Sequence, residues 1–396
     1  MKKSSTYIFI TAVAAFACLC GILFATSAPI TTPKVLATAE DKVSATAFSP
    51  EKAKDMIKFC SVSYEPQKIE SALKDAGYHS FGYFEETGSD GIAAGIALKD
   101  DEDSTKITAV LRGTYKEEWH SNFRIGEEAE HKGFSSAADY VCSQIEDYIL
   151  HQKKDITKVT LEITGHSRGG AAANILAKEY LEEGRFRNVC AYTFASPRVT
   201  AKNCSTQYGG IYNIINPEDF ICYLPLECWG YKRFGTDIPL PSDIKGGDSA
   251  LYKKMQEDFF ARCGFPHKGY ENGKEDVEEM IRSLSFLCPT PRDFSEKEIR
   301  TPSKDVTLTE YMNCLSCVLS GETPVNSALF ILSCLEECSL SPITDLLLEG
   351  ISLKNLSESD SLTQGALFCS HTPEVYKAWL SVLTEEYFLK FTENSP

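Results

Sequence analysis

The chain has 396 residues, of which 43% are hydrophobic and 24% charged, and its net charge at pH 7 is −16. This acidic balance argues against nucleic acids and anionic membrane surfaces as partners, although it does not exclude a neutral ester. The length suits one α/β domain with an insertion better than two independent domains.

The N-terminus has the features of a secretory signal peptide. A basic start at residues 1–3 precedes an almost continuous apolar run over residues 7–25, and small residues at 37–39 offer a cleavage site. We therefore expect an exported protein whose signal peptide spans residues 1–39. The alternative is an uncleaved N-terminal membrane anchor, since the apolar run is long enough to cross a bilayer.

A strand is predicted over residues 107–111, and the turn Arg112-Gly113-Thr114 follows it directly. Thr114 offers a backbone N–H and a hydroxyl, and such donors can stabilise an oxyanion. An Arg-Gly-Thr turn is unremarkable by itself, so its interpretation depends on the elements that follow.

The next element is a strand that runs through a glycine-flanked serine into a helix. Apolar and polar residues alternate over 159–164, and residues 171–180 have the composition and spacing of a helix. Between them, G-H-S-R-G at 165–169 matches the nucleophile elbow, with an ordinary strand-to-helix turn as the alternative. In an elbow Ser167 is the nucleophile, and the backbone N–H of Arg168 points toward the negative charge that develops during catalysis.

Two more strands are predicted after the elbow, over residues 189–194 and 211–215. The second ends in Asn-Pro-Glu-Asp, and the carboxyl ends of parallel strands are where open α/β sheets place their sites. Glu218 and Asp219 therefore both qualify as the acid that orients a catalytic histidine, and their spacing does not separate them. A solvated turn residue is the alternative for either carboxylate.

Two histidines, His267 and His371, follow these acids. We interpret the segment around His371 as a loop leading into a final helix that has Pro373 near its start. Loops on a rigid scaffold hold catalytic bases well, so His371 is the predicted base. His267 lies in a polar stretch and is expected on the surface, whereas His166, beside the serine, is expected to have a structural role.

Residues 241–368 are helix-prone and interrupted by prolines, which predicts a helical insertion between the acid and His371. Our hypothesis is that the insertion caps the sheet and shapes a substrate pocket, and the alternative is a decoration away from the site. The cysteine pairs 314/317 and 334/338 have spacings that a zinc site uses, but the same spacings suit helix packing. We predict no metal and no cofactor.

Taken in order, these motifs resemble the class 3 lipases over roughly residues 105–240. The matching segments are 111–114, Trp119 with Asn122, 131–134, the serine elbow, 194–199, 216–219 and 223–225, and His371 with Tyr376 and Trp379 is similar to the family's closing histidine segment. The resemblance implies an α/β-hydrolase fold, with a mostly parallel central sheet flanked by helices and a helical insertion or cap. It also selects Asp219 over Glu218, and it implies nucleophile Ser167, acid Asp219, base His371, and oxyanion donors Thr114 and Arg168.

The resemblance implies a secreted serine esterase or lipase, of bacterial type, that hydrolyses carboxylic esters of glycerolipids through an acyl-enzyme. The expected partners are a lipid or other apolar ester and, transiently, a lipid interface. The short segment after Thr114 is charged at Lys116, Glu117 and Glu118, which argues against strong interfacial activation. The alternatives are an acyltransferase or thioesterase on the same triad, or a catalytically inactive secreted binding protein.

The expected layout has four parts. They are a signal peptide over 1–39, a lipase core over 40–240, the insertion over 241–368, and the histidine loop with the last core helix over 369–396.

Overall fold

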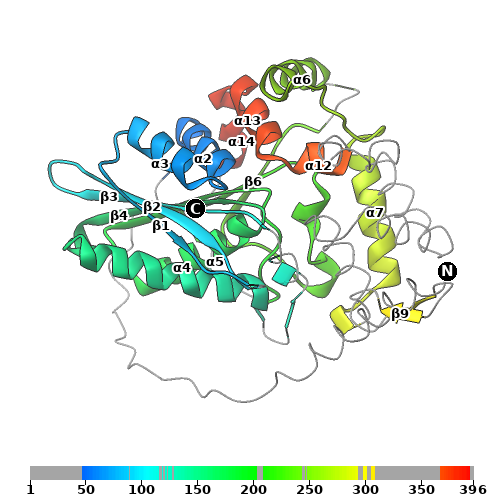
Figure 1. The fold of residues 1–396 in the computed structure, drawn as a ribbon. Helices are drawn as coiled ribbons and strands as arrows, with labels where there is room; N and C mark the ends of the chain where they lie inside the picture. The colour runs from blue at the N-terminus through cyan, green and yellow to red at the C-terminus, as the bar shows by residue number, and fades with distance from the viewer. Residues whose placement is uncertain are drawn as a thin grey trace, which may run out of the picture. The chain divides into compact units, whose positions relative to one another are not determined.

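The structure is a computed structural model, and its elements are labelled in Figure 1. It describes residues 47–88, 90–115, 118, 121–122, 124–126, 129–202, 208–242, 246, 248–292, 298–300, 305–307 and 366–392. The predicted signal peptide, the cysteine pairs considered for zinc, and Lys116, Glu117 and Trp119 lie outside these residues.

A seven-stranded sheet forms the centre of the described chain, and its strands lie side by side in sequence order. The first three strands pair antiparallel, and from the third strand onward every pairing is parallel. The strands are β1 (Ser80–Glu85), β2 (Ala93–Asp100), β3 (Thr105–Leu111), β4 (Val159–His166), β5 (Asn188–Phe194), β6 (Ile211–Ile215) and β7 (Thr236–Pro239).

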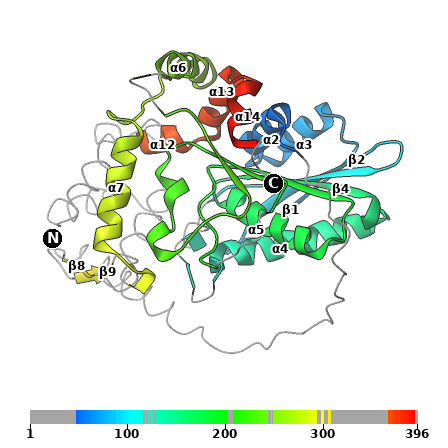
Figure 2. The same cartoon turned by 180° about the vertical axis from the view of Figure 1, so that it is seen from behind.

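Helices cover both faces of this sheet, as Figures 1 and 2 show. One face carries α4 (Lys132–His151) and α5 (Arg168–Glu183), and the other carries α2 (Pro50–Val62), α3 (Pro66–Asp75), α13 (Pro373–Val382) and α14 (Glu385–Thr392). Two buried apolar cores result, one on each side of the strands. This layering confirms the expected α/β-hydrolase fold.

Strand β4 has two different faces, as its alternating sequence predicts. Ile163 belongs to the core shared with α4 and α5, where its apolar neighbours on the strand also lie. The polar residues face α2 instead. Glu162 Oε1 lies 2.7 Å from Lys52 Nζ, and Thr164 Oγ1 lies 3.3 Å from Cys60 Sγ. Both faces are therefore buried, and the polar one also has partners on the neighbouring strands, since Thr108 donates to Glu162 and Thr164 donates to the carbonyl oxygen of Tyr192.

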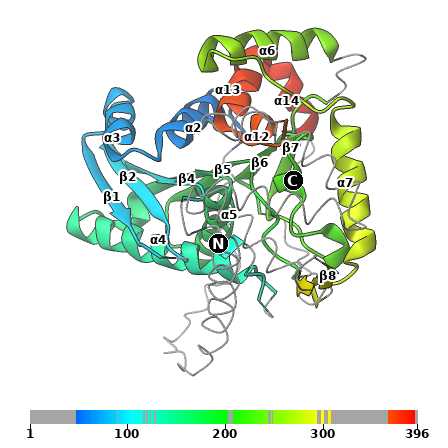
Figure 3. The ribbon, with the colours of Figure 1, turned by 45° about the vertical axis from the view of Figure 1, so that its right-hand side comes forward.

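The described part of residues 241–368 contains two helices and a short hairpin. They are α6 (Ser249–Cys263), α7 (Lys274–Leu287), β8 (Glu298–Arg300) and β9 (Asp305–Thr307). Helix α6 packs on α13, and α7 contacts the 3₁₀ helix η3 (Phe220–Tyr223) that follows Asp219. Helices α7 and α3 lie at opposite ends of this body in Figures 1, 2 and 3. Two short 3₁₀ helices, η2 (Ile156–Lys158) and η4 (Glu227–Trp229), complete the connections.

Three element predictions differ from the structure. Helix α5 begins at Arg168 and not at residue 171, because two glycines of low helix propensity occupy its first turn. His371 ends a short helix, α12 (Ala366–His371), and does not lie in a loop. Helix α13 begins at Pro373 as predicted but is followed by α14, so it is not the last helix.

None of the helices in the described ranges combines the length and apolar composition that a bilayer crossing requires. In the same part of the chain, no three His, Cys, Asp or Glu side chains are grouped so that they could hold a metal ion.

Candidate active site

Ser167 stands on a strained turn between β4 and α5. Its φ of 57° and ψ of −129° are unusual for a residue with a side chain, and such strain occurs at functional sites. The flanking glycines are required by close contacts. A Cβ on Gly165 would lie 2.2 Å from the carbonyl oxygen of Gly169, and one on Gly169 would lie 2.4 Å from that of Leu111. The G-H-S-R-G segment therefore folds as a nucleophile elbow.

A chain of hydrogen bonds joins Ser167, His371 and Asp219. Ser167 Oγ lies 2.9 Å from His371 Nε2, and His371 Nδ1 lies 2.8 Å from Asp219 Oδ2. Asp219 is fully buried, whereas the His371 side chain is 17% exposed. The arrangement can transfer a proton from the hydroxyl to the imidazole while the buried carboxylate stabilises the imidazolium.

The carboxylate of Asp219 accepts further hydrogen bonds that fix its orientation. Its Oδ1 accepts the N–H of Ile221 at 3.0 Å. Its Oδ2 accepts the phenol of Tyr376 at 2.8 Å and the thiol of Cys222 at 3.3 Å, besides the histidine. Four donors therefore converge on this buried carboxylate and hold it in one orientation.

His371 is also held through its backbone. His166 Nε2 donates to the carbonyl oxygen of His371 at 2.6 Å, and Asn216 Nδ2 donates to that of Ser370 at 2.8 Å. Burial lowers the pKa of His166 well below 6.5, so this ring is neutral and supplies a single N–H. His166 therefore contacts the predicted base directly, in the structural role expected for it.

The turn that carries Thr114 lies against the elbow. Strands β3 and β4 are parallel neighbours with Leu111 beside Gly165, so the turn and the elbow leave adjacent strand ends. Thr114 Oγ1 accepts a hydrogen bond from Asn122 Nδ2 at 3.0 Å. Arg168 is the first residue of α5, where N–H groups have no carbonyl partner within the helix. Thr114 thus follows β3 and Arg168 follows β4, at neighbouring strand ends beside Ser167.

Glu218 and His267 lie outside the hydrogen-bond chain. Glu218 is buried beside Tyr252 of α6, whose hydroxyl lies 3.3 Å from Glu218 Oε2. His267 is only 7% exposed and packs edge-on against Tyr252 and Phe259. The surface position predicted for His267 is wrong, because helix α6 covers it. Burial lowers its pKa to about 4.

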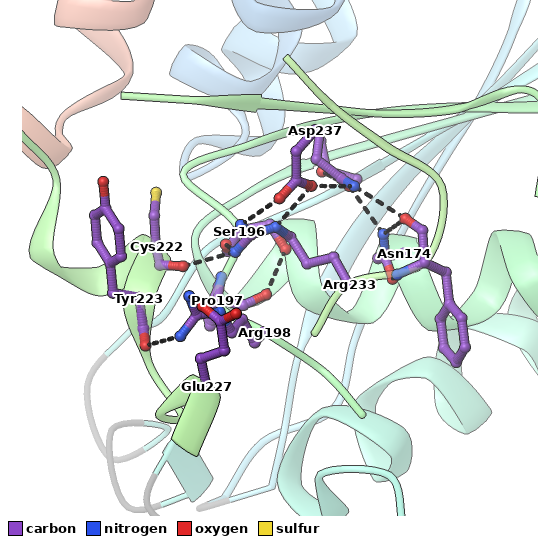
Figure 4. A network of polar contacts seen from close by, with 12 residues as sticks. Asn174, Ser196, Pro197, Arg198, Cys222, Tyr223, Glu227, Arg233 and Asp237 are labelled. Atoms are coloured by element: carbon purple, nitrogen blue, oxygen red, sulfur yellow. Dashed lines mark hydrogen bonds and ion pairs between the residues drawn. The ribbon is translucent and has the colours of Figure 1, made fainter. Parts of the chain in front are cut away.

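Arg233 binds Cys222, which follows the acid in the chain, and Figure 4 shows this contact. Arg233 Nη1 donates to the carbonyl oxygens of Ser196 at 3.0 Å and Cys222 at 2.6 Å. The same guanidinium makes two hydrogen bonds to Asp237, at 3.0 and 2.7 Å. A bidentate pair of this kind fixes the orientation of the arginine, and the arginine then fixes the loop.

The network in Figure 4 extends from this loop to the nucleophile helix. Arg198 Nη1 donates to the carbonyl oxygen of Tyr223 at 2.7 Å. Asn213 Nδ2 donates to Asp237 at 3.0 Å, and Asn174 Nδ2 of α5 donates to Asn213 at 2.8 Å. The roles of Asn174 and Asn213 are not predicted from the sequence, because a lone asparagine on a helix or a strand carries no signal that distinguishes it.

Known proteins resemble this chain in sequence. The family description "Lipase (class 3)" matches residues 105–228. A secreted mono- and diacylglycerol lipase from Fusarium solani is 30% identical over 244 residues, which cover 56% of this chain and 69% of the relative.

Among solved structures, the triacylglyceride lipase of Rhizomucor miehei matches with 21% identity and a TM-score of 0.39, covering 48% of this chain and 79% of that one. Lipase II from Rhizopus niveus matches with 20% identity and a TM-score of 0.39, covering 50% and 81% of the two chains. The sequence relative and the matching motifs show that the chain belongs to the class 3 lipase family.

Proposed function

We propose that this protein is a serine hydrolase that cleaves carboxylic esters by acyl transfer to water. Ser167 attacks the ester carbonyl while His371 takes its proton, and Asp219 stabilises the resulting imidazolium. The N–H groups of Thr114 and Arg168 bind the oxyanion, and water then releases the acyl group. The observation that carries the proposal is the hydrogen-bond chain from Ser167 through His371 to Asp219.

The proposed substrates are esters of glycerolipids. Family membership supports a lipid ester, and the Fusarium solani relative is described as a mono- and diacylglycerol lipase. Tyr115, which follows the oxyanion turn, is 41% exposed and offers an aromatic ring for transient contact with a lipid interface.

The proposed location is outside the cytoplasm, with residues 1–39 removed as a signal peptide. The relative from Fusarium solani is described as secreted, which supports export. The relatives named above are fungal, so the assignment to a bacterial type stays a prediction.

The proposed layout keeps a core over residues 40–240 and 369–396, interrupted by an insertion over 241–368 that caps the site. Two contacts support a cap. Tyr252 of α6 reaches Glu218 beside the acid, and Trp229 Nε1 donates to the carbonyl oxygen of Cys288 at 2.7 Å. Tyr252 therefore touches the acid loop itself, and Cys288 lies against η4 further along the chain.

The test is labelling by a fluorophosphonate probe, together with hydrolysis of monoacylglycerol, diacylglycerol and a matched thioester. Labelling of the wild type should disappear in Ser167→Ala and fall to background in His371→Ala. The control is His79→Ala, whose side chain is 56% exposed and far from the elbow in sequence. A folded wild-type protein that neither reacts nor hydrolyses any ester would refute the proposal, and a preference for the thioester would replace the substrate class.

A further inference from the structure

The side chain of Arg168 is a buried charge that the proposed mechanism does not use. In that mechanism only the backbone N–H of this residue binds the oxyanion, and its side chain is 0% exposed. Burial lowers its pKa to about 10, which leaves it charged at neutral pH. Burying a cation costs free energy unless acceptors satisfy its N–H donors. The hydrogen bonds of this guanidinium therefore show which parts of the chain it holds together.

The guanidinium joins three separate segments to the nucleophile helix. Nη1 donates to the carbonyl oxygen of Gly91 at 2.6 Å, and Nη2 donates to that of Asp90 at 3.0 Å, both before β2. Nη2 also lies 3.4 Å from the carbonyl oxygen of Gly133 in the first turn of α4. Nε donates to Ser121 Oγ at 2.8 Å, and Ser121 belongs to the segment that follows the oxyanion turn.

That segment is folded back on the oxyanion turn by Glu118 and Asn122. Glu118 Oε2 accepts the N–H of Tyr115 at 2.8 Å, immediately after Thr114. The carbonyl oxygen of Glu118 accepts the hydroxyl of Ser121 at 2.8 Å. Asn122 then donates to the hydroxyl of Thr114, as described above. Two of these bonds tie the turn to Glu118 and Asn122, and the third joins Ser121 to Glu118.

Glu118 is also the anion between two buried arginines. It forms an ion pair with Arg112, at the start of the turn, and Arg168 Nη1 lies 4.0 Å from Glu118 Oε2. The three side chains are 6%, 4% and 0% exposed, respectively. Glu118, one of the charged residues noted after Thr114, is therefore buried. Its carboxylate is buried because it compensates two cations.

We propose that the guanidinium of Arg168 is a positioning group that holds the oxyanion turn against the nucleophile elbow. One residue thus supplies a backbone donor for the oxyanion and anchors the segment that carries the second donor, Thr114. The inference rests on the proposed esterase function. Lysine cannot replace this arginine, because an ammonium has no planar fork to reach Ser121, Gly91 and Asp90 together.

The test compares Arg168→Lys and Ser121→Ala with Arg185→Lys, whose side chain is 42% exposed beyond the end of α5. Active sites are titrated with a fluorophosphonate, and kcat and KM for a p-nitrophenyl ester are expressed per titrated site. The inhibition constant of an alkyl boronic acid, which forms a tetrahedral adduct on the serine, is measured on the same samples.

In Arg168→Lys we expect kcat to fall about tenfold, with KM within about twofold of the wild type. This fall is smaller than the fall in kcat that removal of an oxyanion donor causes. The boronic acid should bind more weakly by a similar factor. Ser121→Ala should show a smaller change of the same kind, and it serves if Arg168→Lys does not fold. Arg185→Lys should behave like the wild type.

A lower thermal midpoint with unchanged kcat per titrated site in both variants would overturn the proposal and leave Arg168 a purely structural residue. A wild-type protein that neither reacts with the fluorophosphonate nor hydrolyses the ester would instead refute the proposed function. The two failures are therefore distinguishable.

Discussion

Replacement of Asp219 by asparagine tests the site most directly, because a near-isosteric change removes the charge and half of the acceptors. Asp219 Oδ2 accepts hydrogen bonds from His371, Tyr376 and Cys222, and Oδ1 accepts one from Ile221. An amide places an NH₂ group at one of these two positions. If the amide oxygen faces His371, the NH₂ group faces only one donor, the N–H of Ile221. We expect the asparagine to adopt this orientation.

The expected magnitudes follow from this orientation. The amide opposes the N–H of Ile221, which should cost about 1–3 kcal/mol of the free energy of unfolding. The imidazolium of His371 loses its counter-charge but keeps its acceptor, so kcat should fall by about 10²- to 10³-fold with a small change in KM, less than where an amide also imposes the wrong tautomer of the histidine. Stopped assays at substrate saturation measure kcat, and urea titration measures the stability.

The matched control is Glu218→Gln, which changes the adjacent carboxylate. Glu218 lies against Tyr252 and not against the histidine, so this variant should keep kcat within about twofold of the wild type. Retention of more than about a tenth of kcat in Asp219→Asn would refute the triad, since a misassigned acid costs little. An equal loss in both variants would show that the loop as a whole, and not the counter-charge, is required.

Three further outcomes follow from the described contacts. A methyl group at Gly169 would lie 2.4 Å from the carbonyl oxygen of Leu111, so Gly169→Ala should lower the free energy of unfolding by about 3 kcal/mol or more, as a urea titration would measure. Gly184 ends the same helix with nothing within 4 Å, so Gly184→Ala should lower it by only about 1 kcal/mol. Burial raises the pKa of Glu218 to about 7, so its carboxyl group binds a proton more tightly in the folded protein than in the unfolded chain. The stability that this proton contributes is lost as pH rises from about 4.5 to about 7. The unfolding free energy of Glu218→Gln should therefore rise relative to the wild type by about 3 kcal/mol between pH 4.5 and pH 8, and a constant difference across that range would contradict this assignment. Arg233→Lys should lower kcat severalfold, because the loop at Cys222 loses its guanidinium contact, while the fluorophosphonate still labels Ser167. A kcat equal to that of the wild type would show that the loop keeps its conformation without the guanidinium.

The sequence predicted the parallel strands well, because their alternating residues report directly on burial. Strand β6 has the predicted bounds, and β3, β4 and β5 each differ by one to two residues at their ends. The start of α5 was missed, since Gly169 is selected for contact with β3 and not for helix propensity. Helix α12 has six residues, which is too short for a periodic pattern to appear.

The environment of single side chains was the least predictable feature. The polar neighbours of His267 suggested exposure, but its burial comes from α6, which no local pattern connects to it. The residues alone did not separate Glu218 from Asp219, because the choice depends on where the chain returns 152 positions later. Nothing near Arg233 or Arg168 indicates which carbonyl groups they bind, since those partners come from other segments of the chain.

The serine and its histidine partner are 204 positions apart, and this separation has a consequence for how reactivity arises during synthesis. The elbow and the oxyanion turn are encoded before residue 184, whereas the histidine is encoded in α12. A nascent chain that has not yet reached α12 contains a nucleophile without a base. Its serine would gain reactivity only after the C-terminal helices dock against α2 and α6, so esterase activity would report on the last long-range step of folding.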